Sequence, residues 1–299
     1  MVNVLITGSA GFTGKYLLET LAKNPEYNVL GLDIIPDENP HSQVCDIRNY
    51  RELEKAALNH KPQVIAHLAA QAYIPRSFSD PIEDAEVNII GTINAVRLAK
   101  RFEAKLIYLS SAAVYGRPQT LPISEEHSTK PISPYGLSKL TGEEYIRLLL
   151  PPGRYVIFRP SSIYGIQKGK RHGPVNSLVY SIVRRGFCEV TGSGEQTRDF
   201  IHVSDVARAV KLAINGKLSG VYNLGTGVEH SINQLIALIR RILNRKFEVR
   251  YLPEMNGEIH RSWLNVEKLR RVGFEAKIRL EEGLREVIKY ELESLGKQG

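Results

Sequence analysis

Tyr135 and Lys139 are the first two residues whose types and spacing indicate chemistry. Side chains at positions i and i+4 share one face of a helix, so a helix here makes the phenol and the ammonium group neighbours. A tyrosine with its usual pKa of about 10 is a poor base near neutral pH, but a nearby positive charge favours the phenolate and lowers that pKa. The pair therefore predicts acid–base chemistry by Tyr135. The same spacing also occurs by chance on exposed helices, so it needs support from elsewhere in the chain.

A second hydroxyl group points to the same kind of site. Ser111 ends the segment Leu109-Ser110-Ser111, directly after an apolar run that is typical of a buried strand. In a parallel sheet the carboxyl ends of the strands face the crevice in which ligands bind. Ser111 is then placed to hydrogen-bond an oxygen atom that loses its proton. The alternative is an ordinary strand-end serine that bonds to a loop backbone.

A glycine pattern near the start of the chain predicts a dinucleotide site. Gly8, Gly11 and Gly14 follow a predicted strand and open a predicted helix, which is the context that makes the pattern informative. The first glycine allows a tight turn, the second lets the backbone approach a pyrophosphate, and the third allows close packing of the helix. The helix then offers N–H groups and a positive dipole to the phosphates. Cofactor contacts are predicted for Gly8, Gly11, Phe12, Thr13, Gly14, Asp33 and Ile34.

Asp33 discriminates between the two nicotinamide dinucleotides. It ends the second predicted strand, where a carboxylate accepts hydrogen bonds from the hydroxyl groups of the adenosine ribose. The same carboxylate repels a 2′-phosphate, and no arginine occurs in the segment Asp33-Ile34-Ile35-Pro36. NAD is therefore expected in preference to NADP. In the alternative, the glycines form a purely structural turn and Asp33 caps a loop.

The elements that must position these residues alternate along the chain. Apolar runs typical of buried strands are followed by segments with helical spacing, which predicts an α/β fold with a doubly wound parallel sheet of the Rossmann type. Residues 1–159 are expected to form the NAD-binding domain that carries the catalytic residues. Residues 160–299, with shorter elements, are expected to form a smaller α/β part for the substrate, with some segments returning to the first domain. Strands are predicted at residues 2–7, 29–33, 64–67, 106–109 and 155–158, and helices at 14–23, 82–101 and 135–150.

Composition narrows the possible classes of protein. The chain has 299 residues, of which 42% are hydrophobic and 24% charged, as in ordinary globular proteins. The formal net charge of +8 would suit a nucleic-acid binder, but the basic residues are scattered beside acids, so no nucleic-acid partner is expected. Cys45 and Cys188 have neither the spacing of a metal site nor that of a disulfide framework. No apolar run reaches the roughly 18 residues of a membrane span, and no leader opens the chain, so a cytoplasmic protein without metal or membrane partner is expected.

Taken together, the ordered motifs resemble one known family, the extended short-chain dehydrogenase/reductases, and within it the NAD-dependent nucleotide-sugar epimerase/dehydratase group. The resemblance extends from Val2 to about Tyr290. Besides the glycine pattern, it rests on Asp46-Ile47, His67-Leu68-Ala69-Ala70-Gln71, Asn88-x-x-Gly91-Thr92, Ser110-Ser111-x-x-Val114-Tyr115-Gly116, Pro134-Tyr135-Gly136-x-Ser138-Lys139, Arg159-Pro160, Tyr164-Gly165, Gly192-x-Gly194-x-Gln196-x-Arg198-Asp199-Phe200 and Leu280-Glu281-Glu282-Gly283-Leu284.

The resemblance implies roles for the matching positions. Ser111, Tyr135 and Lys139 match the catalytic trio of the family, and Tyr135 and Lys139 also contact the cofactor, Lys139 through the nicotinamide ribose. Asn88 matches a residue that braces the active-site helix. Further cofactor contacts are implied for Asp46 and Ile47 at the adenine and for Leu68, Ala69 and Ala70 after a strand.

For the substrate, Asn176 and Arg198 match positions that hold the nucleotide diphosphate, and an arginine suits this role because its guanidinium group binds phosphate oxygens in pairs. Members of the family often carry Asn at the position of Ser162. They often carry Arg about three residues before the acid at Glu258, where this chain has Met255. Arg261 is a candidate to replace that phosphate contact. The implied substrate contacts are Gln71, Arg76, Ser111, Ser162, Asn176, Arg198, Arg261 and Ser262.

One departure from the family bears on the reaction. The 4,6-dehydratases of the group carry an Asp-Glu pair after the strand-end hydroxyl, where this chain has Ala112 and Ala113, which neither give nor take a proton. The resemblance then implies an NAD-dependent 4-epimerase of a nucleotide-sugar, of the UDP-glucose/UDP-galactose type, acting through a 4-keto intermediate. The alternatives are an NAD(P)H-dependent 4-ketoreductase of a deoxy nucleotide-sugar and a non-catalytic regulatory or RNA-binding member of the fold. A homodimer paired through residues 82–101 and 135–150 is expected.

The family also suggests a position that sets the sugar preference. Ser262 aligns with a residue beside the C2 substituent, where a large side chain admits only a hydroxyl group and a small one leaves room for an acetamido group. The sequence therefore predicts that N-acetylhexosamine nucleotides fit as well as plain hexose nucleotides. In the alternative, Ser262 is simply a small residue and Trp263 fills the space.

Overall fold

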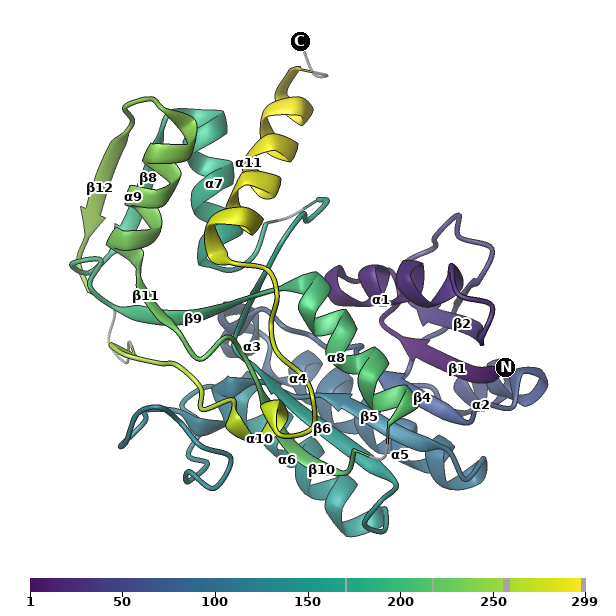
Figure 1. Ribbon diagram of the computed structural model, residues 1–299. Helices are drawn as coiled ribbons and strands as arrows, with labels where there is room; N and C mark the ends of the chain where they lie inside the picture. Colours follow the sequence, from purple (N-terminus) through teal and green to yellow (C-terminus); the bar gives the residue numbers. More distant parts are fainter. Residues whose placement is uncertain (170, 217, 255–258, 297–299) are drawn as a thin grey trace. The chain divides into compact units, whose positions relative to one another are not determined.

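The computed structural model describes residues 1–169, 171–216, 218–254 and 259–296 (Figure 1). The chain divides into two compact units. The first comprises Met1–Arg117, Ser128–Pro160 and Val206–Asn223, and the second comprises Pro118–His127, Ser161–Asp205 and Leu224–Gly299. Residues 206–223 thus belong to the first unit although they follow much of the second unit in the chain. Residues 118–127 lie with the second unit, which no sequence signal indicates.

The first unit is built on a seven-stranded sheet. Its strands are β1 (Val2–Thr7), β2 (Tyr27–Asp33), β3 (Ser42–Val44), β4 (Val64–His67), β5 (Lys105–Leu109), β6 (Tyr155–Pro160) and β10 (Gly220–Leu224). Their order across the sheet is β10-β6-β5-β4-β1-β2-β3. The pairings from β6 through β3 are all parallel, which confirms the predicted doubly wound sheet. The direction of chain progress reverses between β1 and β4, and a crevice for ligands opens at such a switch point.

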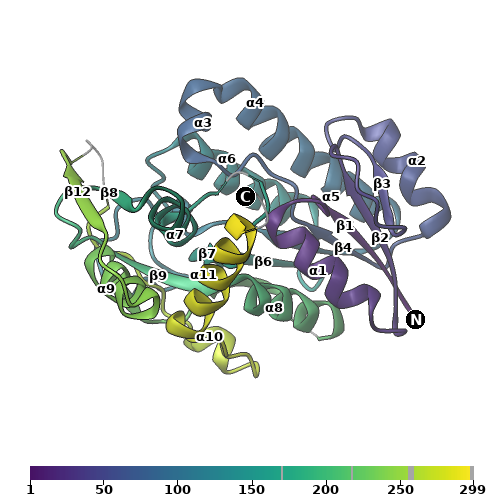
Figure 2. The same cartoon turned by 90° about the horizontal axis from the view of Figure 1, so that it is seen from above.

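Helices cover both faces of this sheet. The helical elements are α1 (Phe12–Ala22), α2 (Tyr50–His60), α3 (Ile74–Ser79), α4 (Pro81–Ala85), the π-helical turn η1 (Glu86–Ile90), α5 (Gly91–Arg101), the 3-10 turn η2 (Ala112–Tyr115), α6 (Pro134–Leu149) and α8 (Val203–Asn215), whose first residues belong to the second unit. Figures 1 and 2 show α1 and α8 on one face and α2, α5 and α6 on the other. The single helix predicted over residues 82–101 is interrupted by η1, and such π-turns occur frequently at functional sites.

The second unit combines small sheets with helices. One sheet contains β11 (Glu229–Ser231), β9 (Thr197–His202) and β7 (Ser162–Tyr164), and a parallel pair contains β12 (Glu248–Leu252) and β8 (Phe187–Thr191). Its helices include α7 (Pro174–Arg185), α9 (Ile232–Leu243), α10 (Glu267–Arg270) and α11 (Leu280–Gly296). Across the described part of the chain, no helix has both the length and the apolar surface needed to cross a bilayer.

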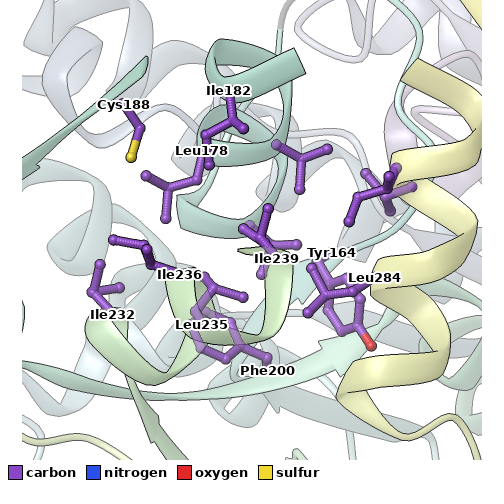
Figure 3. Packing of buried hydrophobic residues seen from close by; sticks show 14 of the residues in the cluster. Tyr164, Leu178, Ile182, Cys188, Phe200, Ile232, Leu235, Ile236, Ile239 and Leu284 are labelled. Carbon is purple, nitrogen blue, oxygen red and sulfur yellow. The ribbon is translucent and has the colours of Figure 1, made fainter. Parts of the chain in front are cut away.

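Three helices supply most of the apolar core of the second unit. Figure 3 shows Ile182 of α7, Leu235 and Ile239 of α9, and Leu284 of α11 in one buried cluster. The buried positions of α9 recur at helical spacing, which places them on one face of the helix. A capping box at Ser231 fixes where α9 begins, and thereby which face meets the core.

Leu235→Ala should lower the free energy of unfolding by about 2–5 kcal/mol, because Leu235 is completely buried and its loss leaves a cavity. Urea unfolding followed by circular dichroism measures the change. The control is Leu292→Ala on α11, where the side chain is 42% exposed and truncation should change the value by about 0.5 kcal/mol or less. Equal effects of the two substitutions would show that the cluster in Figure 3 does not stabilise the unit.

Candidate active site

The turn between β1 and α1 is closed by backbone contacts that leave no room for side chains. Gly8 has a φ of 74°, and a Cβ atom on it would lie 2.6 Å from the amide nitrogen of Ala69. A Cβ atom on Gly14 would lie 1.9 Å from the carbonyl oxygen of Gly8. Gly11 is the N-cap of α1 and donates its N–H to the same carbonyl (3.1 Å). These close approaches require the glycine pattern, and the bare helix N-terminus that follows suits a pyrophosphate.

Asp33 ends β2 beside this turn. Its carboxylate accepts the backbone N–H of Ala10 within the glycine turn (3.0 Å) and that of Ile35 (3.0 Å). The carboxylate is therefore fixed at the edge of the turn and is only partly buried. Ile34, the other predicted contact here, has an exposed side chain. The geometry allows Asp33 to receive ribose hydroxyl groups.

The predicted adenine contacts lie on the segment after β3. Asp46 accepts hydrogen bonds from Nη2 (2.7 Å) and Nε (2.9 Å) of Arg48, and this partner lowers the pKa of the Asp46 carboxyl group. Ile47 is buried with its side chain against Gly91 of α5. A hollow of about 710 Å³ is bounded by Asp46, Arg48 and residues of α2 and α5, but by none of the predicted catalytic trio. This hollow is therefore not the site of the chemistry.

A chain of hydroxyl and imidazole groups holds the end of β4. The hydroxyl group of Thr7 donates to Nδ1 of His67 (2.7 Å), and the Nε2–H of His67 donates to the hydroxyl group of Thr92 (3.1 Å). This tautomer follows because Thr92 gives its own proton to the carbonyl oxygen of Asn88 (2.6 Å). Burial lowers the pKa of His67 to about 3, so the ring is neutral. The N–H of Ala69, in the predicted cofactor segment, donates to the same Thr7 hydroxyl (3.3 Å).

Asn88 on η1 fastens the loop after β4 to helix α6. Its side chain accepts the N–H of Gln71 (2.9 Å) and donates to the carbonyl oxygen of Gln71 and to the carboxylate of Asp84 (both 3.0 Å). The hydroxyl group of Ser138, on α6, lies 3.1 Å from the same nitrogen. The side-chain nitrogen of Gln71 donates to the carboxylate of Asp84 (3.0 Å), and its side-chain oxygen accepts the N–H of Tyr73 (2.7 Å). The side chain of Gln71, a predicted substrate contact, is therefore committed to internal bonds.

Ser111 and Tyr135 meet at the carboxyl end of β5. Ser111 is the N-cap of η2, and its hydroxyl oxygen accepts the N–H of Ala113 (3.1 Å). Burial raises the pKa of Tyr135, a hydrogen bond between its phenol and Ser111 opposes that shift, and the charge of Asp84 adds to it. The net shift is upward, because burial outweighs the favourable partner.

Lys139 lies one turn further along α6 and is also buried. Loss of hydration lowers the pKa of its ammonium group to about 7, while the carboxylates of Glu143 and Asp84 act in the opposite direction. Its Nζ atom lies 4.2 Å from the centre of the Tyr108 ring. A lysine with a pKa near neutrality, next to a buried tyrosine, is a combination found at sites of proton transfer.

A buried ion pair fixes α6 against β6. Arg159 of β6 donates to both carboxylate oxygens of Glu143 over distances of 2.6 to 3.2 Å, and both side chains are almost completely buried. Glu143 also accepts the hydroxyl group of Ser110 (2.6 Å), the neighbour of Ser111. Arg159 donates in addition to the hydroxyl group of Tyr115 (3.0 Å). The pair thus ties the helix that carries Tyr135 to the strand end that carries Ser111.

The second unit contains a cavity of about 570 Å³ that is lined by arginines and by apolar side chains. This volume lies within the range of roughly 300–1,000 Å³ that is usual for ligand pockets. Guanidinium groups suit phosphates, and an apolar wall suits a base. Residues that line the cavity include Arg171, Arg185, Arg198, Gln196, Leu178, Val190 and Ile232.

Two of these arginines are held in place by partners. Nη1 of Arg198 donates to the carbonyl oxygens of Thr197 and Ile259 (both 2.7 Å). Nε of Arg171 donates to the carboxylate of Glu291 on α11 (2.6 Å), and this pair is almost completely buried. Fixed guanidinium groups lose little conformational freedom when they bind an anion.

Asn176 and Ser162, like Arg261 and Ser262, are predicted substrate contacts of the second unit that do not line this cavity. Asn176 of α7 is buried, and its side-chain amide bonds to the N–H (3.4 Å) and the carbonyl oxygen (2.7 Å) of Gly165. It thereby fastens the turn after β7. Ser162 lies on β7, in register with Phe200 of β9. A role of either residue toward the substrate stays a prediction.

The segment with Arg261 and Ser262 lies outside the helices and strands. Arg261 forms an ion pair with Glu229 of β11, with Nε at 3.2 Å from Oε2. Its guanidinium carbon also lies 4.8 Å from the centre of the Trp263 ring. Ser262 stands between these residues and is partly buried. The indole is thus already engaged by its neighbour.

The remaining sequence predictions have different outcomes. Arg76 of α3 forms an ion pair with Glu83 of α4 (2.7 Å from Nη2), within the first unit. Met255 and Glu258, which mark a departure from the family pattern, lie outside the described residues.

The first unit combines a parallel sheet, a glycine turn at its switch point, a Ser–Tyr pair and a buried lysine one helical turn further on. These features define the extended short-chain dehydrogenase/reductase class. A family model described as the NAD dependent epimerase/dehydratase family matches residues 4–225. The chain belongs to this family, which confirms the family predicted from the motifs.

Similar proteins cover nearly the whole chain. A Methanocaldococcus jannaschii protein, provisionally named UDP-glucose 4-epimerase, is 34% identical over 96% of this chain and 97% of its own length. The crystal structure of the Thermotoga maritima UDP-glucose 4-epimerase with UDP-glucose has a TM-score of 0.91 and 30% identity, covering 98% of this chain and 99% of that one. The Thermus thermophilus UDP-glucose 4-epimerase in complex with NAD has a TM-score of 0.88 and 28% identity, covering 96% and 98%.

Sequence reasoning missed the buried groups that surround the catalytic trio. Asp84 and Glu143 are buried carboxylates whose charges act on Lys139, and Tyr108 contacts its Nζ atom. Asp84 stands four residues before Asn88, and Glu143 stands four residues after Lys139. That helical spacing was the available signal, because it places each acid on the same face as a predicted site residue.

Asp84→Asn should lower the pKa of Lys139 further below about 7, because the substitution removes a negative charge that favours the ammonium group. It should also lower the pKa of Tyr135, which the same charge raises. A pH titration of the Lys139 ε-carbon resonance by NMR measures the first change. Glu86→Gln, at an exposed carboxylate on η1, is the control and should leave that titration unchanged. An unshifted Lys139 in Asp84→Asn would contradict the charge interaction.

Proposed function

We propose that this protein is an NAD-dependent epimerase that interconverts C4 stereoisomers of a UDP-sugar, of the UDP-glucose/UDP-galactose type, through a 4-keto intermediate. The geometry that carries the proposal is the buried Tyr135 phenol, whose partner Ser111 opposes the rise of its pKa, with Lys139 buried one turn further along the same helix. The proteins that the chain resembles over nearly its whole length are named for this activity.

The first unit fits NAD. Gly8, Gly11 and Gly14 project no side chain at the turn, so a pyrophosphate can approach the backbone. The carboxylate of Asp33, held by the N–H of Ala10, is placed for the hydroxyl groups of the adenosine ribose and repels a 2′-phosphate. Held at this turn, NAD would supply the chemistry of reversible hydride transfer with the sugar, with no net consumption of cofactor. Further proposed contacts are Phe12, Thr13, Ile34, Asp46, Ile47, Leu68, Ala69, Ala70 and Asn88.

The catalytic trio moves the proton. Tyr135 takes the proton of the C4 hydroxyl group and returns it after the keto sugar has turned in the site. Ser111 hydrogen-bonds the reacting oxygen and the phenol. The ammonium group of Lys139 stabilises the phenolate as it forms, so Lys139 must be charged when Tyr135 gives up its proton. One acid–base group then serves both halves of the reaction.

Other reactions of the family fit the residues less well. Ala112 and Ala113 begin η2 directly after Ser111 and offer no acid–base pair for dehydration. A 4-ketoreductase would use the same trio but would consume reduced cofactor in each turnover. A non-catalytic protein would have no use for a buried lysine whose pKa lies near neutrality.

We assign the nucleotide of the substrate to the cavity of the second unit. Arg198 and Arg171 are held there by fixed partners, which suits a diphosphate. The apolar wall then suits the flat face of the base. Five further residues are proposed to shape the substrate site through the loops that they hold in place: Gln71, Arg76, Ser162, Asn176 and Arg261.

We propose a homodimer formed through α4, η1 and α6 of the first unit. Ile82, Ile90, Leu137 and Leu148 expose 72%, 46%, 56% and 80% of their surface. Large apolar side chains this exposed on adjacent helices are typical of a face that another subunit covers. The proposed compartment is the cytoplasm, because both cysteines are free and buried, as suits a reducing environment.

Tyr135→Phe should lower turnover of UDP-galactose by about 100-fold or more, the scale of losing an acid–base group, while the bound NAD content stays unchanged. The assay reads UDP-glucose formation by NMR without added cofactor. Tyr145→Phe is the matched control, since Tyr145 lies on the same helix with 38% of its surface exposed. Near-normal turnover in Tyr135→Phe would remove Tyr135 from the mechanism, and a need for stoichiometric NADH in the native protein would favour the reductase.

We further propose that Ser262 leaves room for an acetamido group at C2. Ser262→Tyr should lower turnover of UDP-N-acetylglucosamine relative to UDP-glucose by at least about 10-fold, because the larger side chain fills the space beside C2. The same NMR assay with both pairs of sugars measures the ratio, and Ser262→Ala is the control that should preserve it. An unchanged ratio in Ser262→Tyr would show that Ser262 is not the gate.

A further inference from the structure

Side chains from three elements stack beside the catalytic pair. The rings of His67 on β4 and Tyr108 on β5 are nearly parallel, with centres 5.7 Å apart and an angle of 18° between their planes. The Nζ atom of Lys139 on α6 lies 4.2 Å from the centre of the Tyr108 ring. This distance is well within the roughly 6 Å over which a cation is attracted to an aromatic face.

The Tyr108 ring is fixed in this position. It is completely buried, and its hydroxyl group bonds to Thr92 and lies 3.4 Å from the carbonyl oxygen of Lys139. A Cβ atom on Gly142 would lie 2.6 Å from the hydroxyl oxygen of Tyr108, so the glycine makes the space that the phenol occupies. Burial also raises the pKa of the Tyr108 phenol well above its usual value. The ring therefore presents a neutral, immobile aromatic face to the ammonium group.

The charged and titratable groups around Lys139 have partners other than its ammonium group. They are Asp84 of α4, Glu143 and Tyr135 of α6, Tyr108 of β5 and His67 of β4. Glu143 is paired with Arg159, Asp84 accepts the amides of Gln71 and Asn88, and His67 is neutral. Within the described part of the chain, no carboxylate forms a direct ion pair with Lys139. The Tyr108 ring is thus a close contact that offsets part of the lost hydration.

We propose that Tyr108 is a positioning residue for the reaction, whose aromatic face holds the ammonium group of Lys139 next to Tyr135 and keeps it charged. The inference rests on the proposed function only in taking Lys139 as a member of the catalytic trio. A desolvated cation gains more from an aromatic face than an exposed one does. Because Tyr135 needs a charged neighbour to give up its proton, the ring acts on catalysis through Lys139 and touches neither substrate nor cofactor.

Fluorinated rings test the proposal without emptying the core. Tyr108→Phe keeps the aromatic face and is the reference variant. Placing 4-fluoro-, 3,5-difluoro- or 3,4,5-trifluorophenylalanine at position 108 then withdraws electrons from the ring face stepwise, with little change in the size of the ring. In the purified holoenzyme, the pKa of Lys139, read from its ε-carbon resonance, should fall with each added fluorine. Tyr108→Leu should remove the upfield ring-current shift of the Lys139 ε-protons. The control is 3,4,5-trifluorophenylalanine at Phe158, a buried ring of β6, which should leave Lys139 unchanged.

The pH dependence of turnover gives the matching functional result. Activity that needs a charged Lys139 is lost as the pH rises through the pKa of that residue, so a lower pKa moves this loss to lower pH. If the pKa falls by about one unit, the trifluoro variant should lose about tenfold in kcat at pH 8, with little change at about pH 5 and an unchanged KM. A Lys139 pKa that ignores fluorination, or a kcat lowered equally at all pH values, would overturn the proposal. Failure of the proposed function would instead appear as absent UDP-sugar turnover with the NMR series intact.

Discussion

Removing the ammonium group of Lys139 from water is the constraint on which much of the first unit depends. Burial lowers its pKa to about 7, and nearby carboxylates limit the fall. Each carboxylate brings its own requirement, because a buried anion is costly unless it is paired or hydrogen-bonded. Glu143 forms an ion pair with Arg159, and Asp84 accepts hydrogen bonds from the side-chain amides of Asn88 and Gln71. The buried polar network from the loop after β4 to strand β6 follows from placing one lysine inside the protein.

The second unit places a different kind of cation at its cavity. Arg171 and Arg198 stand at the cavity with partners that fix their guanidinium groups. A guanidinium group keeps its charge at any pH that a protein meets, which suits a ligand whose charge is permanent. Lysine changes charge readily when buried, which suits a site where a proton must move. The distribution of the two residue types therefore matches the tasks assigned to the two units.

Local pattern predicted most of the first unit. The glycine turn and five strands could be recognised because their signals lie within a few residues, and β4 has the predicted bounds. The sequence did not predict β3 or β10. Strand β3 has too few residues for a recognisable pattern, and β10 comes from a segment far along the chain. The burial of Tyr135, which raises its pKa, could not be predicted, because only the folded chain creates it. The commitment of Asn176 to Gly165 is of the same kind, since a backbone partner leaves no mark in the sequence.

Strand β10 has a consequence for the order in which the chain is made. It completes the first sheet beside β6, yet it leaves the ribosome only after β7, α7, β8 and β9 have done so. Until then β6 is an open edge whose unpaired N–H and C=O groups can recruit a strand from another nascent chain. Contacts between distant segments form late because the intervening loop must first be closed. A gene shortened at the apparent domain boundary would make that transient open edge permanent.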